Sequence, residues 1–136
     1  MTDRPTLHLT NWASRRLHGP GRKLTIMRRP RAWEHGDGRV AALIPGLRDL
    51  ADVQDGTLDL DGYIARCRVH FSTFPLPPGQ LWTTAGGGTP VADGDTLCCA
   101  CSRANAAQGA CHRVVAAELL AAAGWRVLLD GMEVEP

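Results

Sequence analysis

A chain of 136 residues can bury one hydrophobic core but is too short for two ordinary domains, so we expect a single domain over residues 1–136. Hydrophobic residues make up 44% of the sequence and charged residues 21%, which excludes wholesale disorder. The longest apolar stretch, residues 114–124, falls short of the roughly 20 residues that a membrane-spanning helix needs, so no membrane partner is expected.

Charge is unevenly distributed along the chain. Residues 1–31 contain eight basic residues and one acidic residue, whereas residues 32–136 contain seven basic and thirteen acidic residues. Two interpretations stay open. The basic N-terminal part, residues 1–38, binds an anionic partner such as a phosphate-containing small molecule or a nucleic acid, or it pairs with the acidic remainder of the same chain.

The first residues, Met-Thr-Asp-Arg-Pro-Thr, lack the basic start and the long apolar core of a secretory signal, so we expect a cytoplasmic protein. Four of the five cysteines lie between positions 98 and 111. In a reducing compartment, such clustering favours catalysis, metal binding or packing over a disulfide framework. The sequence does not indicate an oligomeric state.

The first third of the chain predicts two strands joined by a loop. Residues 6–10 alternate apolar and polar side chains and are typical of a strand, and residues 24–27 form a second apolar segment. Gly19-Pro20-Gly21 marks the loop between them, and residues 28–38 follow as a further loop rich in arginine. That second loop comes directly after a strand, where α/β proteins usually bind their ligands.

The middle of the chain predicts one helix. Residues 40–44 are apolar but too few to distinguish a strand from a helix. From Asp59, a suitable N-cap, apolar residues recur at helical spacing until Pro75 ends the helix. The residues expected on its buried face are Tyr63, Cys67 and Phe71. Residues 83–94 contain three consecutive glycines and predict a flexible connection.

The last third predicts a strand–helix–strand unit over residues 95–131. Residues 95–99 are typical of a buried strand, a turn follows over residues 102–109, residues 111–123 have helical periodicity, and residues 125–129 form a final strand. Gly124 is placed to end the helix. The expected inner face of this helix consists of Val115, Leu119 and Ala122 or Ala123. Since such a unit makes its strands parallel, we predict the α/β class, with a Rossmann-like, mostly parallel sheet flanked by helices.

The turn into the last helix carries the best candidate for chemistry, the sequence Cys111-His112-Arg113. Cys111 is expected at the helix N-cap, where unpaired backbone N–H groups favour a thiolate or a bound anion. We therefore assign catalytic roles to Cys111 as nucleophile and His112 as proton carrier, and an anion-binding role to Arg113. Two alternatives stay open for Cys111, an anion-contacting backbone role without covalent chemistry and plain packing, because no third residue clearly orients His112. The other residues expected to contact the ligand are Asn11, Arg15, Arg28, Arg31 and Cys101.

A metal site is a rival interpretation of the same cysteines. The four candidate zinc ligands are Cys98, Cys101, Cys111 and His112, and Cys-x-x-Cys is half of a structural zinc site. Two points weigh against zinc: adjacent residues such as Cys111 and His112 rarely reach one ion, and neighbouring residues on a strand point to opposite faces. We therefore expect no cofactor, with zinc and a Cys98–Cys101 redox pair as alternatives.

These motifs resemble the YeaO-like family of bacterial and phage proteins, a domain of unknown function. The resemblance covers residues 60–123 and rests on Tyr63 in a helix, on the Gly-Asp-Thr-Leu-Cys-Cys strand, and on Cys-His-Arg opening an apolar helix. Family members have a Leu-Leu-Cys or Leu-Leu-Tyr strand before Cys-His-Arg, and here the stretch between Cys98 and Cys111 is longer. The resemblance implies a Rossmann-like sheet with the Cys-His-Arg turn at its ligand edge, and it brings no established activity.

The sequence thus predicts a protein that binds, and in one interpretation processes, a phosphorylated or nucleotide-like ligand at the Cys-His-Arg turn. As an enzyme it would depend on Cys111. The alternatives are a small structural zinc protein and a nucleic-acid-binding module, in which arginines of residues 19–31 contact phosphates and Trp12 or Trp33 stacks on bases. Binding of a ligand at the Cys-His-Arg turn requires the Cys111 thiol and the Arg113 guanidinium to be open to solvent.

Overall fold

The computed structural model describes residues 4–84, 87–101 and 111–136. Its centre is a five-stranded sheet with the strand order β2-β5-β1-β6-β7. The strands are β1 (Thr6–Asn11), β2 (Lys23–Thr25), β5 (Thr96–Cys99), β6 (Arg126–Leu129) and β7 (Met132–Glu133). All neighbouring pairs among the first four are parallel, and only β7 pairs antiparallel, with β6. The α/β class and the mostly parallel sheet are therefore confirmed.

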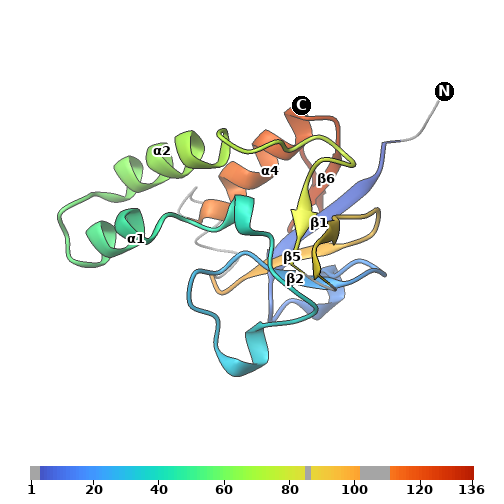
Figure 1. The fold of residues 1–136 in the computed structure, drawn as a ribbon, viewed down its shortest axis with the longest axis horizontal. Coiled ribbons are helices and arrows are strands. Elements are labelled where there is room, and N and C mark those ends of the chain that lie inside the picture. Colours follow the sequence, from blue (N-terminus) through green and yellow to red (C-terminus); the bar gives the residue numbers. More distant parts are fainter. Residues whose placement is uncertain (1–3, 85–86, 102–110) are drawn as a thin grey trace.

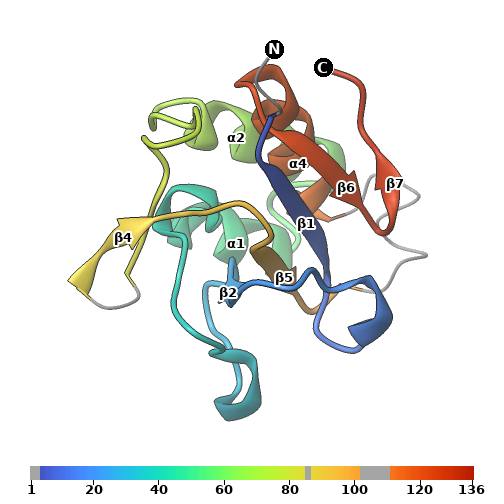
Figure 2. The ribbon, with the colours of Figure 1, turned by 90° about the vertical axis from the view of Figure 1, so that its right-hand side faces the viewer.

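Three helices of the described residues lie on one side of this sheet, as Figure 1 and Figure 2 show. They are α1 (Leu47–Gln54), α2 (Leu60–Phe71) and α4 (His112–Ala122). Helix α4 packs on β1 and β6, α2 packs against α4, and α1 packs against α2. Short 3-10 turns lie at η1 (Arg15–Leu17), η2 (Ala32–Glu34) and η3 (Ala41–Leu43). No helix in the described ranges has the length and apolar character that crossing a membrane would take.

Strand alternation explains the core. On β1 and β5, Leu9, Leu97 and Cys99 are buried in the cluster that also contains residues of α4. Successive side chains on a strand point to opposite faces, so Thr10 and Cys98 belong to the other face. The predicted helix over residues 60–71 is confirmed, with its three expected inner residues buried and the Asp59 carboxylate accepting a hydrogen bond from the Gly62 N–H at 2.7 Å.

The inner face of α4 differs from the expected one. Leu120 is fully buried, whereas Leu119 is only partly buried and Ala122 is exposed. Arg113, which the sequence analysis assigned to anion binding, is also buried, in the first turn of the helix. The end of the helix is as expected, because Gly124 follows the C-cap with a φ of +112°.

Three other segments differ from the sequence interpretation. Residues 83–94 contribute to a small antiparallel hairpin of β3 (Trp82–Thr83) and β4 (Thr89–Pro90), rather than only a connection. Residues 40–44 contain the 3-10 turn η3, and α1 was not anticipated. Helix α1 contains no buried residue, although Leu47, Leu50 and Ala51 recur at helical spacing. The expected turn at residues 102–109 lies outside the described residues.

Candidate functional site

The Cys-His-Arg turn lies in the interior of the protein. Cys111 is the N-cap of α4, as predicted. The exposed fractions of Cys111, His112 and Arg113 are 1%, 7% and 0%. The opening to solvent that an anion site at this turn requires is therefore not present at the thiol or at the guanidinium.

The Arg113 guanidinium is held by internal partners. Its Nη1 donates to the backbone oxygen of Cys101 at 2.7 Å and contacts the Cys99 sulfur at 3.1 Å. Its Nη2 forms an ion pair with the Asp130 carboxylate at 3.0 Å, and Asp130 also accepts a hydrogen bond from the Thr10 hydroxyl at 2.8 Å. Because a buried charge must be paired, these contacts give Arg113 a structural role, which corrects its expected role as a clamp on an external anion.

Three thiols meet beside this guanidinium. The sulfurs of Cys99, Cys101 and Cys111 all lie within 4.8 Å of one another, and those of Cys99 and Cys111 are 3.3 Å apart. This thiol cluster could hold a metal ion. Cys98 is not part of it, because it faces the other side of the sheet, where its sulfur lies 4.0 Å from His18 Nε2. Of the four expected zinc ligands, Cys101 and Cys111 belong to this group, Cys98 and His112 do not, and Cys99 joins it.

His112 borders the thiol cluster and is oriented by the backbone. Its Nε2 lies 2.8 Å from the carbonyl oxygen of Ile26, which fixes the proton on Nε2. The unprotonated Nδ1 then faces the Cys111 sulfur at 3.9 Å. Burial lowers the pKa of His112, so the imidazole is neutral. The group that orients His112 is therefore the backbone carbonyl of Ile26, which the sequence alone could not identify.

The negative charge of the thiol cluster is best carried by Cys101. Hydrogen bonds from the thiols of Cys111 and Cys99 lower the pKa of Cys101. The same hydrogen-bonded arrangement raises the pKa of Cys111, and burial adds to that shift. Cys111 is consequently a buried, protonated thiol, whereas the nucleophile role assigned to it needs an accessible thiolate.

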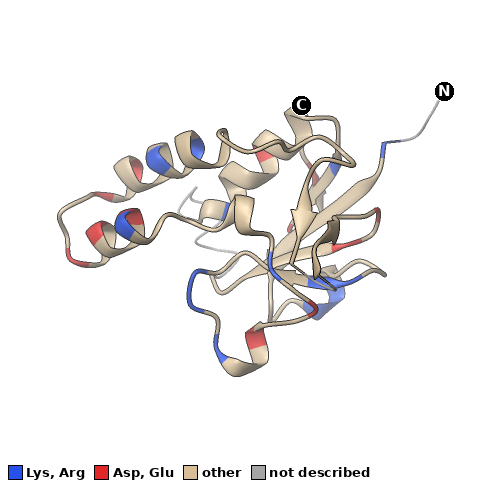
Figure 3. Ribbon diagram, viewed as in Figure 1, with Lys and Arg blue, Asp and Glu red and all other residues tan. Residues whose placement is uncertain are grey.

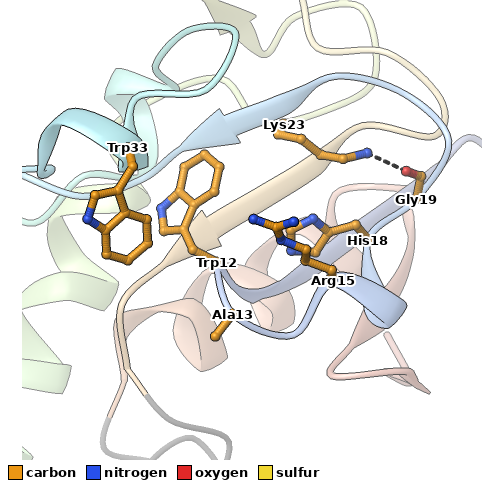
Figure 4. A pocket seen from close by; sticks show the side chains of 7 residues that line it. All are labelled: Trp12, Ala13, Arg15, His18, Gly19, Lys23 and Trp33. Atoms are coloured by element: carbon orange, nitrogen blue, oxygen red, sulfur yellow. Dashed lines mark hydrogen bonds between the residues drawn. The ribbon is translucent and has the colours of Figure 1, made fainter.

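A separate cavity lies on the opposite face of the sheet. It has a volume of about 520 Å³, which is within the range typical of small-molecule sites. Its lining, drawn in Figure 4, consists of Trp12, Ala13, Arg15, His18, Gly19, Lys23 and Trp33. We call it the Trp12 cavity. None of these residues is acidic, so the cavity is an electropositive hollow between two indole rings.

Two glycines pack closely against side chains and backbone around the Trp12 cavity. Gly36 has a φ of +58°, and a Cβ there would lie 2.7 Å from the edge of the Trp12 ring and 2.2 Å from the Lys23 carbonyl oxygen. A Cβ on Gly19 would lie 2.3 Å from the His8 ring. Only glycine fits at these two positions, because any side chain would displace the walls of the cavity.

Several polar groups at the Trp12 cavity have hydrogen-bonding or ion-pairing capacity that the described residues do not use. Lys23 Nζ donates to the carbonyl oxygens of Gly19 and Gly21 at 2.6 and 3.0 Å, which uses two of its three N–H groups. The buried Trp12 Nε1 has no hydrogen-bond partner among the described residues. Arg15 is exposed, and its guanidinium takes part in none of the ion pairs found within the described ranges.

The two sites are connected through Asn11 at the end of β1. Its side-chain amide donates to the Cys101 carbonyl oxygen at 3.1 Å, and its side-chain oxygen accepts the Ser14 N–H at 2.8 Å. Its own carbonyl oxygen accepts a hydrogen bond from His18 Nε2 at 3.0 Å. Asn11 therefore fixes the segment of the thiol cluster and the cavity wall relative to each other, and does not itself line the cavity.

The other expected basic residues do not gather at one site. Arg15 lines the Trp12 cavity. Arg28 donates from Nε and Nη2 to the carbonyl oxygen of Pro45 at 3.0 and 2.8 Å, so it braces a loop. Arg31 is the exposed N-cap of η2. Figure 3 colours the ribbon at Lys and Arg positions, and such positions occur at the η1 turn and in the loop before η2. The interpretation that the basic N-terminal part pairs with the acidic remainder of the chain also holds in part, because Arg22 pairs with the buried Asp95 at 2.7 Å.

Sequence reasoning missed Cys99 and Asp130 at the thiol cluster, and His18 and Lys23 at the cavity. For Cys99 a signal exists: it lies two residues after Leu97, and strand alternation gives the two residues the same face. Asp130 follows the last strand at the ligand edge of the sheet, which is a weaker signal. Comparisons with protein-family models, curated proteins and solved structures found no match to this chain. The resemblance to the YeaO-like family stays a prediction.

Proposed function

We propose that this protein binds a nucleotide-like ligand in the Trp12 cavity, with the base against the indoles and the phosphate at Arg15 and Lys23. One observation carries the proposal: a single cavity combines two tryptophans with two cations and has no carboxylate in its lining. Nucleotides present an aromatic face and a negative group, which are the complements of these two features.

The aromatic half of the cavity supports binding of a base. Figure 4 shows the Trp12 ring lying between the Trp33 ring and the side chain of Arg15. Trp33 is 63% exposed on η2, so its indole is available to a ligand. Stacking of a base on an aromatic side chain contributes about 1–3 kcal/mol.

The cationic half supports binding of a phosphate. Lys23 is held in place by two carbonyl oxygens and keeps one N–H group for a ligand. Arg15 is exposed, and its planar guanidinium suits bidentate contact with phosphate oxygens. The proposal moves the anion site from the Cys-His-Arg turn to the other face of the sheet, where the basic N-terminal part of the chain is accessible.

Calorimetric titration of the full chain with AMP, adenosine and inorganic phosphate tests the proposal. We expect AMP to bind more tightly than either fragment, because it uses both halves of the cavity. Trp33→Ala should weaken AMP binding by about tenfold, which corresponds to about 1.4 kcal/mol. Arg15→Ala should weaken AMP and phosphate but not adenosine.

Two exposed residues outside the cavity lining provide matched controls. Trp82 is 54% exposed on β3, and Arg16 follows Arg15 in η1. Trp82→Ala and Arg16→Ala should bind AMP like the unaltered protein. Absence of AMP binding, or equal losses in Trp33→Ala and Trp82→Ala, would contradict the proposal. Tighter binding of a single-stranded oligonucleotide, with affinity falling steeply with salt, would instead assign the cavity to nucleic acid.

A further inference from the structure

The thiol cluster of Cys99, Cys101 and Cys111 lies outside the Trp12 cavity and is not used by the proposed ligand. We propose that it binds one Zn²⁺ ion through its three sulfur atoms. Thiolates are preferred zinc ligands, and three of them converge here from β5, from the residue pair that follows it, and from the N-cap of α4.

The distances fit one ion. At a Zn–S bond length of about 2.3 Å, sulfurs in a tetrahedral site lie about 3.8 Å apart. The three sulfurs of the cluster all lie within 4.8 Å of one another, and the Cys99 and Cys111 sulfurs are 3.3 Å apart. The Cys99–Cys111 separation is shorter than the tetrahedral value and the other two separations are at most 4.8 Å, so a small movement of the side chains brings all three sulfurs to bonding distance of one centre.

The surrounding charge fits a three-thiolate zinc site. Zn²⁺ with three thiolates carries a net charge of −1, which is costly to bury without compensation. The buried Arg113 guanidinium, which also pairs with Asp130, places positive charge against the ligand sulfurs, because its Nη1 contacts the Cys99 sulfur at 3.1 Å and the Cys111 sulfur at 3.6 Å. Hydrogen bonds from a neighbouring cation to the ligand sulfurs are the kind of outer contact that tunes a metal site.

The cluster also has a natural open side. Cys99 and Cys111 are buried, whereas Cys101 is only partly buried. The described ranges supply no fourth ligand to the group of three sulfurs. Three protein ligands with a fourth position for water are the arrangement found in catalytic zinc sites, while structural sites use four protein ligands.

Zinc titration of the reduced full chain, first stripped with a chelator, tests the proposal. We expect one Zn²⁺ per chain by elemental analysis, and Co²⁺ substitution should give thiolate-to-cobalt charge-transfer absorption. Cys101→Ser should weaken zinc binding by at least tenfold. This variant keeps its fold, because the contacts of Asn11 and Arg113 at this residue are to its backbone oxygen.

Cys98 provides the matched control, because it neighbours Cys99 on the same strand but faces the other side of the sheet. Cys98→Ala should keep zinc at one ion per chain. Zinc should also protect Cys101 from iodoacetamide, since Cys101 is the exposed member of the cluster. Failure of the reduced protein to bind zinc, or unchanged affinity in Cys101→Ser, would overturn the proposal. So would equal loss of zinc in the two variants while circular dichroism shows both folded.

Discussion

The guanidinium of Arg113 is buried beneath the thiol cluster, and Asp130 is the carboxylate that pairs with it. The Arg113 side chain is fully buried, and that of Asp130 is 16% exposed. Asp130 adopts a φ of +49°, a conformation that aspartate tolerates better than most residues. Removing one partner of a buried ion pair leaves the other charge uncompensated, which costs far more than breaking a pair at the surface.

Asp130→Asn should therefore destabilise the protein by about 3 kcal/mol. Urea unfolding followed by circular dichroism measures this loss. The exposed ion pair between Arg68 and Glu118 serves as the comparison, since both of its side chains are nearly half exposed. Glu118→Gln should cost at most about 1 kcal/mol. A similar cost for the two substitutions would show that Arg113 does not depend on Asp130 for its compensation.

Helix α4 is the element that links the core to the thiol cluster. Its first turn places Cys111 and Arg113 at the cluster, and its later turns bury Val115 and Leu120 against the sheet. The indole of Trp125, directly after the helix, donates to the Leu76 carbonyl oxygen at 2.7 Å and fixes the far end. Packing along its whole length therefore sets the position of the sulfur at its N-cap.

The rotational position of α4 can be tested with two adjacent leucines. Leu120 is fully buried, whereas Leu119 is only partly buried. Leu120→Ala should cost about 2–5 kcal/mol, because it leaves a cavity in the core. Leu119→Ala should cost about 1 kcal/mol or less. Thermal or urea unfolding measures the loss of stability in each variant. A larger loss for Leu119→Ala would support the inner face that the periodicity alone predicts.

At the scale of the whole molecule, the thiol cluster and the Trp12 cavity lie on opposite faces of the central strands. The consecutive residues Cys98 and Cys99 point to opposite faces, one toward His18 of the cavity wall and the other into the thiol cluster. Asn11 bonds to both sides. The sheet thus holds the two proposed sites back to back, and each can be altered by side-chain substitution without removing the other.

Stability as a whole should depend on pH through His8, whose ring packs against Gly19. Burial, Lys23 and Arg126 lower the pKa of His8, and Asp93 opposes them weakly. In the unfolded chain a histidine pKa is about 6.5, so below that pH the unfolded state binds more protons than the folded state. The free energy of unfolding should consequently fall as pH falls below about 6.5.

Urea unfolding at pH 7.5, 6.5 and 5.5 measures this dependence. The variant His8→Asn should show a smaller decrease between pH 6.5 and 5.5 than the unaltered protein. Its stability at pH 7.5 provides the reference, because histidine is uncharged there in both states. The same decrease in the two proteins would show that His8 does not contribute to acid sensitivity.

The sequence by itself determined the elements that depend on local pattern. Alternation identified β1, a short apolar run identified β5, helical spacing with an N-cap identified α2, and Gly124 marked the end of α4. It also predicted that Cys98 and Cys99 face opposite ways. These features need only neighbouring residues, because capping, turn conformation and side-chain direction are set within a few positions of the chain.

Only the tertiary structure decided which strand face meets the helices, and with it the membership of the thiol cluster. Arg113 reads as a surface residue until Asp130, which is brought beside it by the return of the chain through β6, supplies its opposite charge. The Trp12 cavity likewise joins the turn after β1, η1, β2 and η2. Burial and charge pairing depend on residues that are far apart in the sequence. The local sequence pattern does not indicate which of these residues will meet.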